Sequence, residues 1–283
     1  MSNGKLEKVG VIGLGIIGSR VAENLRRAEK HVYVWSRSPK PEPNFLGSPA
    51  EVAENSEVIM IFVSDGNALL EVVESMESML DRGHVVLNHS TVDVESTKRA
   101  AAIVEGSGAA FFDCPFTGSK AAAENNQLVF YVGGIEALLE RVRPLLEIVS
   151  KEILYVGNVG DATVLKIATN MISAATVQAT AEALAVTESQ AVDGNRLIEA
   201  LNVNGNCSDL IRMKLPTMLA GDYDPHFALK NMFKDAQLAL GLANDAKIDV
   251  PALSTTASLM FKAIQKGHSE DDFSVLASSY SNE

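Results

Sequence analysis

The chain has 283 residues, of which 47% are hydrophobic and 21% charged. This composition is typical of a globular protein and excludes a disordered chain. At roughly 100–200 residues per domain, the length predicts two domains. The 24 Lys and Arg residues against 36 Asp and Glu give a net charge of −12. That charge argues against nucleic acid and anionic membrane surfaces as partners, so a bound phosphate group must be held by local contacts.

The cysteine and histidine content limits the possible metal and redox chemistry. The two cysteines, Cys114 and Cys207, exclude a disulfide scaffold and a multi-cysteine zinc site. The five histidines show no metal-ligand spacing such as H-x-x-x-H, so no metal site is expected. The first residues, Met1–Lys8, are polar and lack the apolar region of a secretory signal, and the apolar stretches are too short to span a bilayer. We therefore expect a cytoplasmic protein.

The first half of the chain alternates strand patterns with helical patterns. Runs rich in β-branched and aromatic residues predict strands at Lys8–Ile12, His31–Trp35, Val58–Val63, His84–Leu87, Ala110–Asp113, Leu128–Val132 and Ile153–Val156. The helical patterns among them are Ile16–Arg27, Asn67–Met79, Val94–Val104 and Ile135–Val149. This alternation predicts a Rossmann-like α/β domain over residues 1–160, with a doubly wound and mostly parallel sheet.

The second half is predicted to be entirely helical. From Ala162 to Gln190 the chain has no Pro or Gly, and apolar residues recur almost all round the helical wheel. We expect one long buried helix over residues 161–190, roughly 40 Å long at ~1.5 Å per residue, which joins the two domains. The later helical patterns are Asn195–Leu201, Ser208–Met218, Ala228–Asp245, Ala252–Lys266 and Asp271–Ala277. They predict an all-α domain over residues 191–283.

A helix that is apolar on every side needs partners on every side. Packing within the chain could cover it entirely. Alternatively, one face could remain for a second copy of the chain, in a homodimer or homotetramer.

A G-x-G-x-x-G sequence follows the first predicted strand directly and opens a helical pattern. Its residues are Gly13, Leu14, Gly15, Ile16, Ile17 and Gly18. The first glycine allows a tight turn, the second lets the backbone approach a pyrophosphate, and the third lets the helix pack close to the strand. In this context the motif predicts dinucleotide binding. The alternative is a glycine-rich turn in an α/β domain that binds no ligand.

The residues after the second predicted strand indicate which dinucleotide is bound. Proteins selective for NAD usually have Asp or Glu there, to hold the ribose 2′-OH, whereas this chain has Ser36, Arg37 and Ser38. The Arg37 guanidinium can face a 2′-phosphate and stack on adenine, and both serines can donate hydrogen bonds. We therefore expect a preference for NADP(H), with NAD(H) possible. The alternative is that Arg37 is a solvated loop charge.

Two further strand ends are polar and rich in small residues. They are Asn88-His89-Ser90-Thr91 and Asp113–Lys120, and ligands of such sheets bind outside the carboxyl ends of strands. The backbone N–H groups of Gly118 and Ser119, with the hydroxyls of Thr117 and Ser119, could hold a small carboxylate. An ordinary loop could have the same composition.

Lys166 is the single cation of the predicted long helix, and Asn170 lies four residues on, on the same face. A buried lysine needs water, an anion or a cavity, and burial lowers the pKa of a lysine towards the range used in proton transfer. The alternative is a lysine whose stem packs on apolar surface while its ammonium reaches solvent.

Five motifs in order make the sequence resemble the β-hydroxyacid dehydrogenase family nearly end to end. That family includes 3-hydroxyisobutyrate dehydrogenase, tartronate semialdehyde reductase and the glyoxylate/succinic semialdehyde reductases. The motifs are the glycine fingerprint with Ala22 and Asn24, Ser90-Thr91-Val92-Asp93, Asp113–Ser119, Gly157…Gly160…Lys166…Asn170, and Lys234–Leu240. Similarity to the glyoxylate/succinic semialdehyde reductase subgroup is carried by Gly118-Ser119-Lys120 with Glu124, Gln127-Leu128, Phe227–Lys230 and Asp272-Phe273-Ser274.

The resemblance implies a role for each matching residue. Lys166 would be the catalytic acid/base, and Asn170 would orient the substrate or the lysine. The substrate carboxylate would be held by Thr117, Gly118 and Ser119. Contacts to the cofactor would come from Thr91, Lys234, Val63 and Ser64. Without the resemblance, Lys234 and Asp235 would be interpreted as a solvated charge pair.

The implied activity is the NADPH-dependent reduction of a small aldehyde acid to the hydroxy acid. Two alternatives remain: an NAD(P)-dependent dehydrogenase of the 3-hydroxyisobutyrate type, and a non-catalytic NADP-binding scaffold or sensor. Thr117, Phe116 and Ala162 depart from the family pattern, which affects the expected substrate more than the expected reaction.

Overall fold

The structure is a computed structural model that describes residues 7–280. The chain forms two compact units, one up to Lys166 and one from Ile167 onwards. The predicted boundary at residue 160 lies six residues earlier, because the first turns of the long helix belong to the first unit. Residues 1–6 of the polar segment Met1–Lys8 lie outside the described residues.

In the described residues, the first unit is built on an eight-stranded sheet. Its strands are β1 (Lys8–Ile12), β2 (His31–Trp35), β3 (Val58–Ile61), β4 (Val85–Asn88), β5 (Ala110–Asp113), β6 (Phe116–Thr117), β7 (Leu128–Gly133) and β8 (Ser150–Gly157). Their order is β2-β1-β3-β4-β5-β7-β6, with β8 beside β7. The strands β1 to β5 are parallel, and in register Val9 lies between Val32 and Val58. The predicted α/β sheet is thus confirmed, but β7 runs antiparallel to both β5 and β6.

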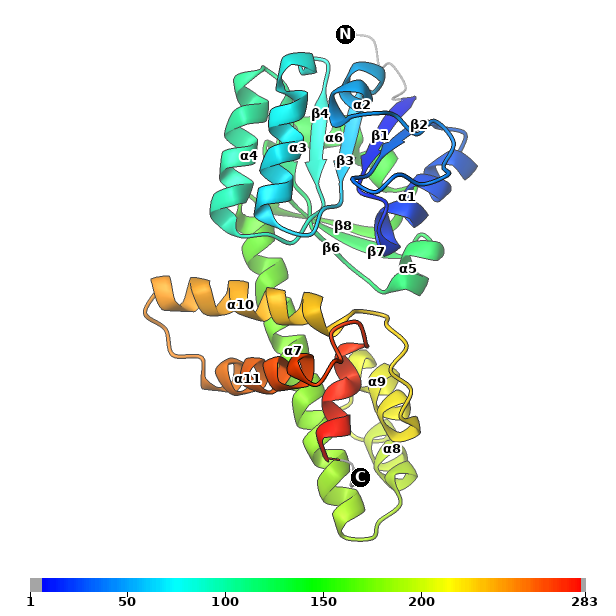
Figure 1. Cartoon of the computed structure of the whole chain (residues 1–283), viewed down its shortest axis with the longest axis vertical. Coiled ribbons are helices and arrows are strands. Elements are labelled where there is room, and N and C mark those ends of the chain that lie inside the picture. Colours follow the sequence, from blue (N-terminus) through cyan, green and yellow to red (C-terminus); the bar gives the residue numbers. More distant parts are fainter. Residues whose placement is uncertain (1–6, 281–283) are drawn as a thin grey trace. The chain divides into compact units, whose positions relative to one another are not determined.

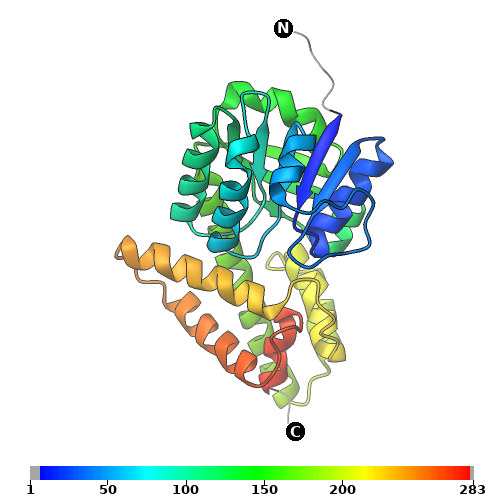
Figure 2. The same ribbon diagram turned by 45° about the horizontal axis from the view of Figure 1, so that its top comes forward.

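Helices cover both faces of this sheet (Figure 1). The helices of the unit are α1 (Ile16–Arg27), α2 (Pro49–Asn55), α3 (Gly66–Met76) with a 3₁₀ turn at Glu77–Met79, α4 (Val94–Gly106), α5 (Lys120–Glu124) and α6 (Glu136–Leu146). One apolar core joins the sheet to α1, α5 and α6, and a second joins its other face to α2, α3 and α4. In Figure 2, α3 and α4 again lie side by side. This two-sided packing is the doubly wound arrangement that the alternating pattern predicted.

Three short elements were missed by the sequence analysis. They are α2, β6 and α5, which have seven, two and five residues. Such lengths are too short to show a helical or strand period. Side-chain caps fix where both helices begin: Ser48 accepts a hydrogen bond from the N–H of Glu51, and Ser119 from that of Ala122.

The strand order places a switch in topology between β1 and β3, because the chain leaves β1 for β2 on one side and returns to β3 on the other. In doubly wound sheets, ligands bind at the carboxyl ends of the strands at this point. The segments after β1 and β3, which carry Gly13 and Val63, are therefore the first place to look for a site.

The second unit is entirely helical in its described residues. The long helix α7 (Asp161–Ser189) runs unbroken into it, followed by α8 (Gly194–Asn202), α9 (Asp209–Ala220), α10 (Leu229–Asp245) and α11 (Pro251–Gln265). Both views show α10 and α11 side by side (Figures 1 and 2). The segment predicted as a helix at Asp271–Ala277 is a 3₁₀-helix, Phe273–Tyr280. No helix in the described part of the chain is long and apolar enough to cross a membrane.

The long helix is not buried all round within one chain, so the alternative of complete burial within the chain is wrong. Val164 and Leu165 are each 42% exposed, Ile172 is 66% exposed and Val186 65%. The opposite side packs into the core of the second unit through residues such as Ala174 and Val177. The even apolar pattern therefore reflects both a core face and an uncovered apolar face.

Candidate active site

The glycine loop after β1 has a geometry that only glycine satisfies. Gly13 has φ +96°, and a Cβ atom built there would lie 2.0 Å from the carbonyl oxygen of Phe62 at the end of β3. A Cβ at Gly18 would lie 2.0 Å from the carbonyl oxygen of Gly13. These two glycines let strand, loop and helix approach one another closely.

Gly15 differs, because a Cβ built there would have no neighbour within 4 Å. It faces open space at the N-terminus of α1, where no side chain caps the helix. Unpaired N–H groups and the positive end of the helix dipole make such a position suited to a pyrophosphate. The neighbouring Leu14 is buried, Ile17 packs on the core, and Ile16 is 45% exposed. The loop therefore fits the dinucleotide that the motif predicts.

The loop after β2 carries the predicted 2′-phosphate residues. Arg37 and Ser38 are exposed, whereas the Ser36 hydroxyl donates a 2.7 Å hydrogen bond to the carbonyl of Ser38. Ser36 therefore shapes the loop rather than presenting a free donor. Lys40, which sequence reasoning missed, donates to the carbonyl of Leu14 and ties this loop to the glycine loop. Lys40 lies two residues after Ser38 in the sequence, and this closeness to the predicted 2′-phosphate residues could have marked it as a candidate.

The ends of β3 and β4 meet through hydrogen bonds. The N–H of Val63 donates to the Ser90 hydroxyl at 2.9 Å, and the Ser64 hydroxyl donates to Asp65 at 2.6 Å. Asp65 in turn caps α3 by accepting from the N–H of Ala68. Thr91 follows Ser90 and is half-buried. The predicted residues Val63, Ser64 and Thr91 thus lie on adjacent strand ends.

The predicted carboxylate-binding loop follows β5. Thr117 is half-buried and Gly118 exposed, and Gly118 has φ +138°, a conformation open to glycine. The Ser119 hydroxyl oxygen accepts a 3.2 Å bond from the N–H of Ala122 as the N-cap of α5. Its O–H can still donate, so Ser119 can cap the helix and bind an acceptor at once.

Lys166 lies beside this loop. It is 8% exposed, and its Nζ is 6.0 Å from the ring centroid of Phe116. A lysine whose ammonium reaches solvent would be more exposed, so the structure argues against that alternative for Lys166.

Within the second unit, Asn170 and Lys234 converge on Asp235. The Asn170 amide donates a 2.6 Å hydrogen bond to Asp235 Oδ2, and Lys234 Nζ is 2.8 Å from Asp235 Oδ1. Asp235 is 2% exposed, so the interpretation of a solvated charge pair is wrong. Asp235 is a site candidate that sequence reasoning missed, since a Lys-Asp pair on a helix carries no sign of burial.

A buried histidine supports the strand ends of the first unit. His89 Nδ1 is 2.6 Å from the carbonyl of Cys114, so this nitrogen carries the proton. The ring stacks on Phe62 at 4.7 Å and contacts Phe130 at 4.8 Å. Burial lowers the pKa of His89 to about 3 and raises that of the Cys114 thiol. His89 is thus a neutral packing residue. In the described chain, no cluster of three His, Cys, Asp or Glu residues could hold a metal ion.

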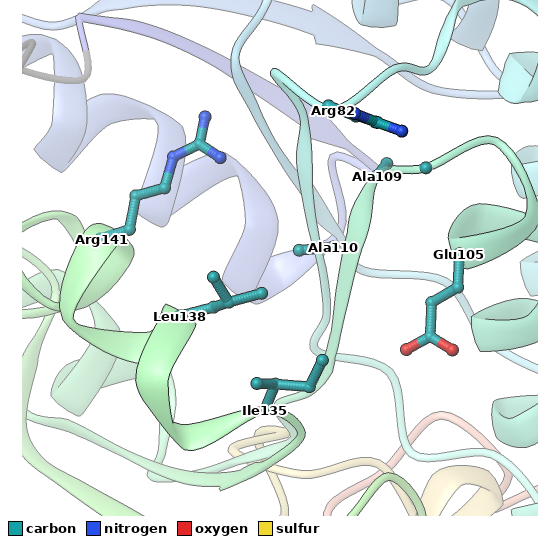
Figure 3. Close-up of a pocket in the computed structure, with 8 residues that line it drawn as sticks. Arg82, Glu105, Ala109, Ala110, Ile135, Leu138 and Arg141 are labelled. Atoms are coloured by element: carbon teal, nitrogen blue, oxygen red, sulfur yellow. The ribbon is translucent and has the colours of Figure 1, made fainter. Parts of the chain in front are cut away.

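A separate hollow of about 500 Å³ lies at the amino end of β5, away from Asp113 and the strand ends described above. Arg82, Glu105, Ile135, Leu138 and Arg141 are among its lining residues (Figure 3). The guanidinium of Arg82 points away from Arg141, so the two cations do not converge on one ligand (Figure 3). None of the predicted site residues lines this hollow.

The fold and the glycine loop define a dinucleotide-binding α/β domain followed by a helical second unit. Two family models match the chain, one after the other. The NAD binding domain of 6-phosphogluconate dehydrogenase matches residues 8–157, and the model described as NAD-binding of NADP-dependent 3-hydroxyisobutyrate dehydrogenase matches residues 160–280.

The chain is similar to named relatives over nearly its whole length. It is 31% identical to glyoxylate/succinic semialdehyde reductase 2, chloroplastic, of Arabidopsis thaliana, over 95% of this chain and 78% of the relative. It is also 31% identical to 2-hydroxy-3-oxopropionate reductase of Escherichia coli, over 95% of each. The structure of Mycobacterium tuberculosis 3-hydroxyisobutyrate dehydrogenase with L-serine has the same fold, with a TM-score of 0.90, 22% identity and coverage of 98% and 100%.

The chain belongs to the β-hydroxyacid dehydrogenase family and is an NAD(P)-dependent oxidoreductase acting on CH–OH groups.

Proposed function

We propose that the protein reduces a small aldehyde acid, of the glyoxylate or succinic semialdehyde type, to the hydroxy acid with NADPH. The observation that carries the proposal is the buried Lys166 ammonium beside the Phe116–Ser119 loop. A cation and a set of carboxylate-binding groups on neighbouring segments match a substrate that has both an aldehyde and an acid group. The glyoxylate/succinic semialdehyde reductase and the 2-hydroxy-3-oxopropionate reductase to which the chain is similar support the same substrate class.

Each end of the substrate has its own proposed partners. The N–H groups of Gly118 and Ser119 and the hydroxyl of Thr117 bind the carboxylate. The nicotinamide, when bound, supplies a hydride to the aldehyde carbon. As the C=O pair of electrons moves to oxygen, the Lys166 ammonium stabilises the charge and gives that oxygen its proton. Solvent then reprotonates the lysine.

The other proposed residues orient these groups. Asn170 is held by Asp235 and is assigned to orienting the substrate or Lys166. Lys234, Thr91, Val63 and Ser64 are assigned to the cofactor. The buried Asp235 carboxylate contacts both Asn170 and Lys234, which supports placing these two residues in one site.

The proposed preference for NADPH rests on the loop after β2. Arg37 and Ser38 are exposed there, and no acidic residue follows the strand directly. A guanidinium group can bind a 2′-phosphate through two parallel hydrogen bonds. A ribose 2′-hydroxyl, as in NADH, cannot form this pair of bonds. Replacing Arg37 by alanine is expected to raise the KM for NADPH about tenfold, for a loss of ~1.4 kcal/mol, and to leave that for NADH nearly unchanged.

The direct test is the loss of NADPH absorbance, with NADH in parallel, against glyoxylate, succinic semialdehyde, methylglyoxal and tartronate semialdehyde. Turnover of at least one aldehyde acid, faster with NADPH and poor with the uncharged methylglyoxal, is the expected result. Oxidation of 3-hydroxyisobutyrate without reduction of any aldehyde acid would favour the dehydrogenase alternative. Cofactor binding with no turnover in either direction would favour the scaffold alternative.

We also propose that the protein is a homodimer or homotetramer whose contact includes the exposed face of α7. Ile172 and Val186 on that face are each about two-thirds exposed in the single chain, at 66% and 65%. Analytical ultracentrifugation should give the mass of more than one copy of the chain, and I172K should shift that mass towards the monomer.

The proposed compartment is the cytoplasm, in keeping with two unpaired cysteines, Cys114 and Cys207.

A further inference from the structure

We propose that Asp113 and Thr163 form a positioning pair that fixes the first turn of α7, and with it Lys166, against the Phe116–Ser119 loop. The inference rests on the proposed function, in which Lys166 is the proton donor. Neither residue is assigned a role in the proposed reaction, and both are fully buried, at 0% exposure.

One carboxylate makes three hydrogen bonds to this turn. Asp113 Oδ2 accepts from the N–H of Gly160 at 3.0 Å and from the N–H of Thr163 at 2.8 Å. Its Oδ1 accepts from the Thr163 hydroxyl at 2.7 Å. The same hydroxyl lies 3.4 Å from that of Thr97 on α4. Bonds to two amides and a side chain of one turn hold it against both sliding and rotation.

The Asp113–Thr163 pair lies next to both parts of the proposed site whose positions matter for the reaction, the Phe116–Ser119 loop and Lys166. Asp113 is the last residue of β5 and stands three residues before Phe116, where the loop begins. Thr163 stands three residues before Lys166, one turn earlier on nearly the same helix face. Because one carboxylate joins both segments, it sets the distance between the loop and the lysine. A misplacement of about 1 Å at a reacting centre can lower the rate ~10²-fold.

The chemistry of the contact requires a carboxylate. The three groups that bond to the Asp113 side chain are all donors, and an asparagine would turn an NH₂ group towards at least one of them. Gly160 adopts φ +100°, which turns its N–H to Asp113 in a conformation that other residues rarely adopt. Burial raises the pKa of Asp113, and the hydrogen bonds from Thr163 and Gly160 oppose that shift.

The test uses variants of Thr163, because valine has nearly the same shape as threonine but cannot donate the hydrogen bond to Asp113 Oδ1. T163V removes the hydroxyl donor, T163S keeps it, and T180V removes another buried hydroxyl of α7 that bonds to the carbonyl of Thr176. With glyoxylate or succinic semialdehyde and NADPH, T163V is expected to lower kcat about tenfold while both KM values change less than about twofold. T163S and T180V are expected to keep kcat near the wild-type value.

A double-mutant cycle and hydrogen exchange separate positioning from mere folding. In a K166A background, T163V should cause no further loss of the residual rate, because its effect passes through Lys166. Amide exchange of the Gly157–Lys166 segment should be faster in T163V than in wild type or T180V, whether or not substrate is present.

Three outcomes would overturn the positioning role: wild-type kcat in T163V, an equal further loss in the K166A background, or unchanged exchange in the Gly157–Lys166 segment. A wild-type protein that reduces no aldehyde acid would instead overturn the proposed function, and the role assigned to Lys166 with it. Hydrogen exchange would then still report whether Asp113 and Thr163 fix the turn.

Discussion

Two of the buried aspartates, Asp113 in the first unit and Asp272 in the second, are held in opposite ways. Asp113 in the first unit is bound by uncharged donors, two N–H groups and one hydroxyl. In the second unit, both carboxylate oxygens of Asp272 accept 2.7 Å hydrogen bonds from the Lys214 ammonium. They also accept from the backbone N–H groups of His226, Phe227 and Ser274.

The pKa values of these aspartates move in opposite directions. Burial raises the pKa of Asp113, and the hydrogen bonds only partly oppose it. Burial is also the largest single influence on Asp272 and raises its pKa, but the charge and hydrogen bonds of Lys214, with the N–H groups of Phe227 and Ser274, together outweigh it and lower the pKa of that carboxyl. A buried cation thus holds Asp272, whereas Asp113 is held by uncharged donors that fix the backbone around it. The same contrast applies to the buried lysines: Lys166 is assigned to chemistry and Lys214 to structure.

The largest expected effect is on Lys166 and concerns activity. Replacing it by alanine removes the proton donor, and a positioned acid contributes typically ~10²–10⁴-fold to the rate. We expect kcat for aldehyde reduction to fall by at least that range, with NADPH binding and thermal stability nearly unchanged. K151A, at an exposed lysine of the same unit, is the matched control. Near-normal turnover in K166A would contradict the proposal that Lys166 is the proton donor, and with it the contrast with Lys214.

The second effect is on Lys214 and concerns stability. Its side chain is 2% exposed and that of Asp272 3%. Removing one partner of such a pair leaves an uncompensated buried charge, which costs about 3–5 kcal/mol. We expect K214M to lower the free energy of unfolding by this amount in urea titrations, without a specific loss of kcat per folded molecule.

The exposed pair Lys230–Glu270 is the control for Lys214. Its Nζ to Oε1 distance is also 2.7 Å, but the side chains are 48% and 74% exposed. An exposed pair contributes about 0–1 kcal/mol, so K230M should cost no more than that. Equal losses in K214M and K230M would show that burial of the ion pair does not set its contribution.

The smallest effect concerns His89, a third buried group, whose pKa is lowered to about 3 by burial. The folded protein keeps it neutral, while the unfolded chain protonates it near pH 6.5. Its contribution is therefore complete above pH 6.5 and is lost as pH falls from 6.5 towards 3. Between pH 7.5 and 5.5 the loss is about 1.4 kcal/mol.

Comparing the wild type with H89N measures this contribution. Urea unfolding at both pH values should show a smaller pH dependence in H89N, whereas H31Q, at an exposed histidine, should behave as the wild type. The same pH dependence in H89N and wild type would mean that His89 is protonated without cost in the folded state.

Much of the fold could be predicted from local pattern. The strands β1, β2 and β5 begin and end where the sequence placed them, and α7 was predicted within one residue at each end. The glycine loop was predicted from its spacing after a strand: Gly13 and Gly18 are required by close backbone contacts, whereas Gly15 faces open space. The elements missed, α2, β6 and α5, are too short to show a period, and the antiparallel β7 has the same strand pattern as a parallel one.

The candidate site was predicted less completely. Lys166 stood out as a cation in an apolar helix, and Thr117–Ser119 as a polar strand end. Asp235, Lys40 and the contact between Asp113 and Thr163 did not stand out, because each contact joins residues far apart in the chain. The sequence shows residue types but not which of them meet.

The sequence by itself determined the two-unit organisation, the order of strands and helices along the chain, the dinucleotide loop and the helix that carries Lys166. These follow from hydrophobic period, helix caps and glycine positions, which act over a few residues. The tertiary structure decided which charges are buried and what holds them. Burial and electrostatic partners depend on topology, and they give Asp113 and Asp272 opposite pKa shifts although both are aspartates.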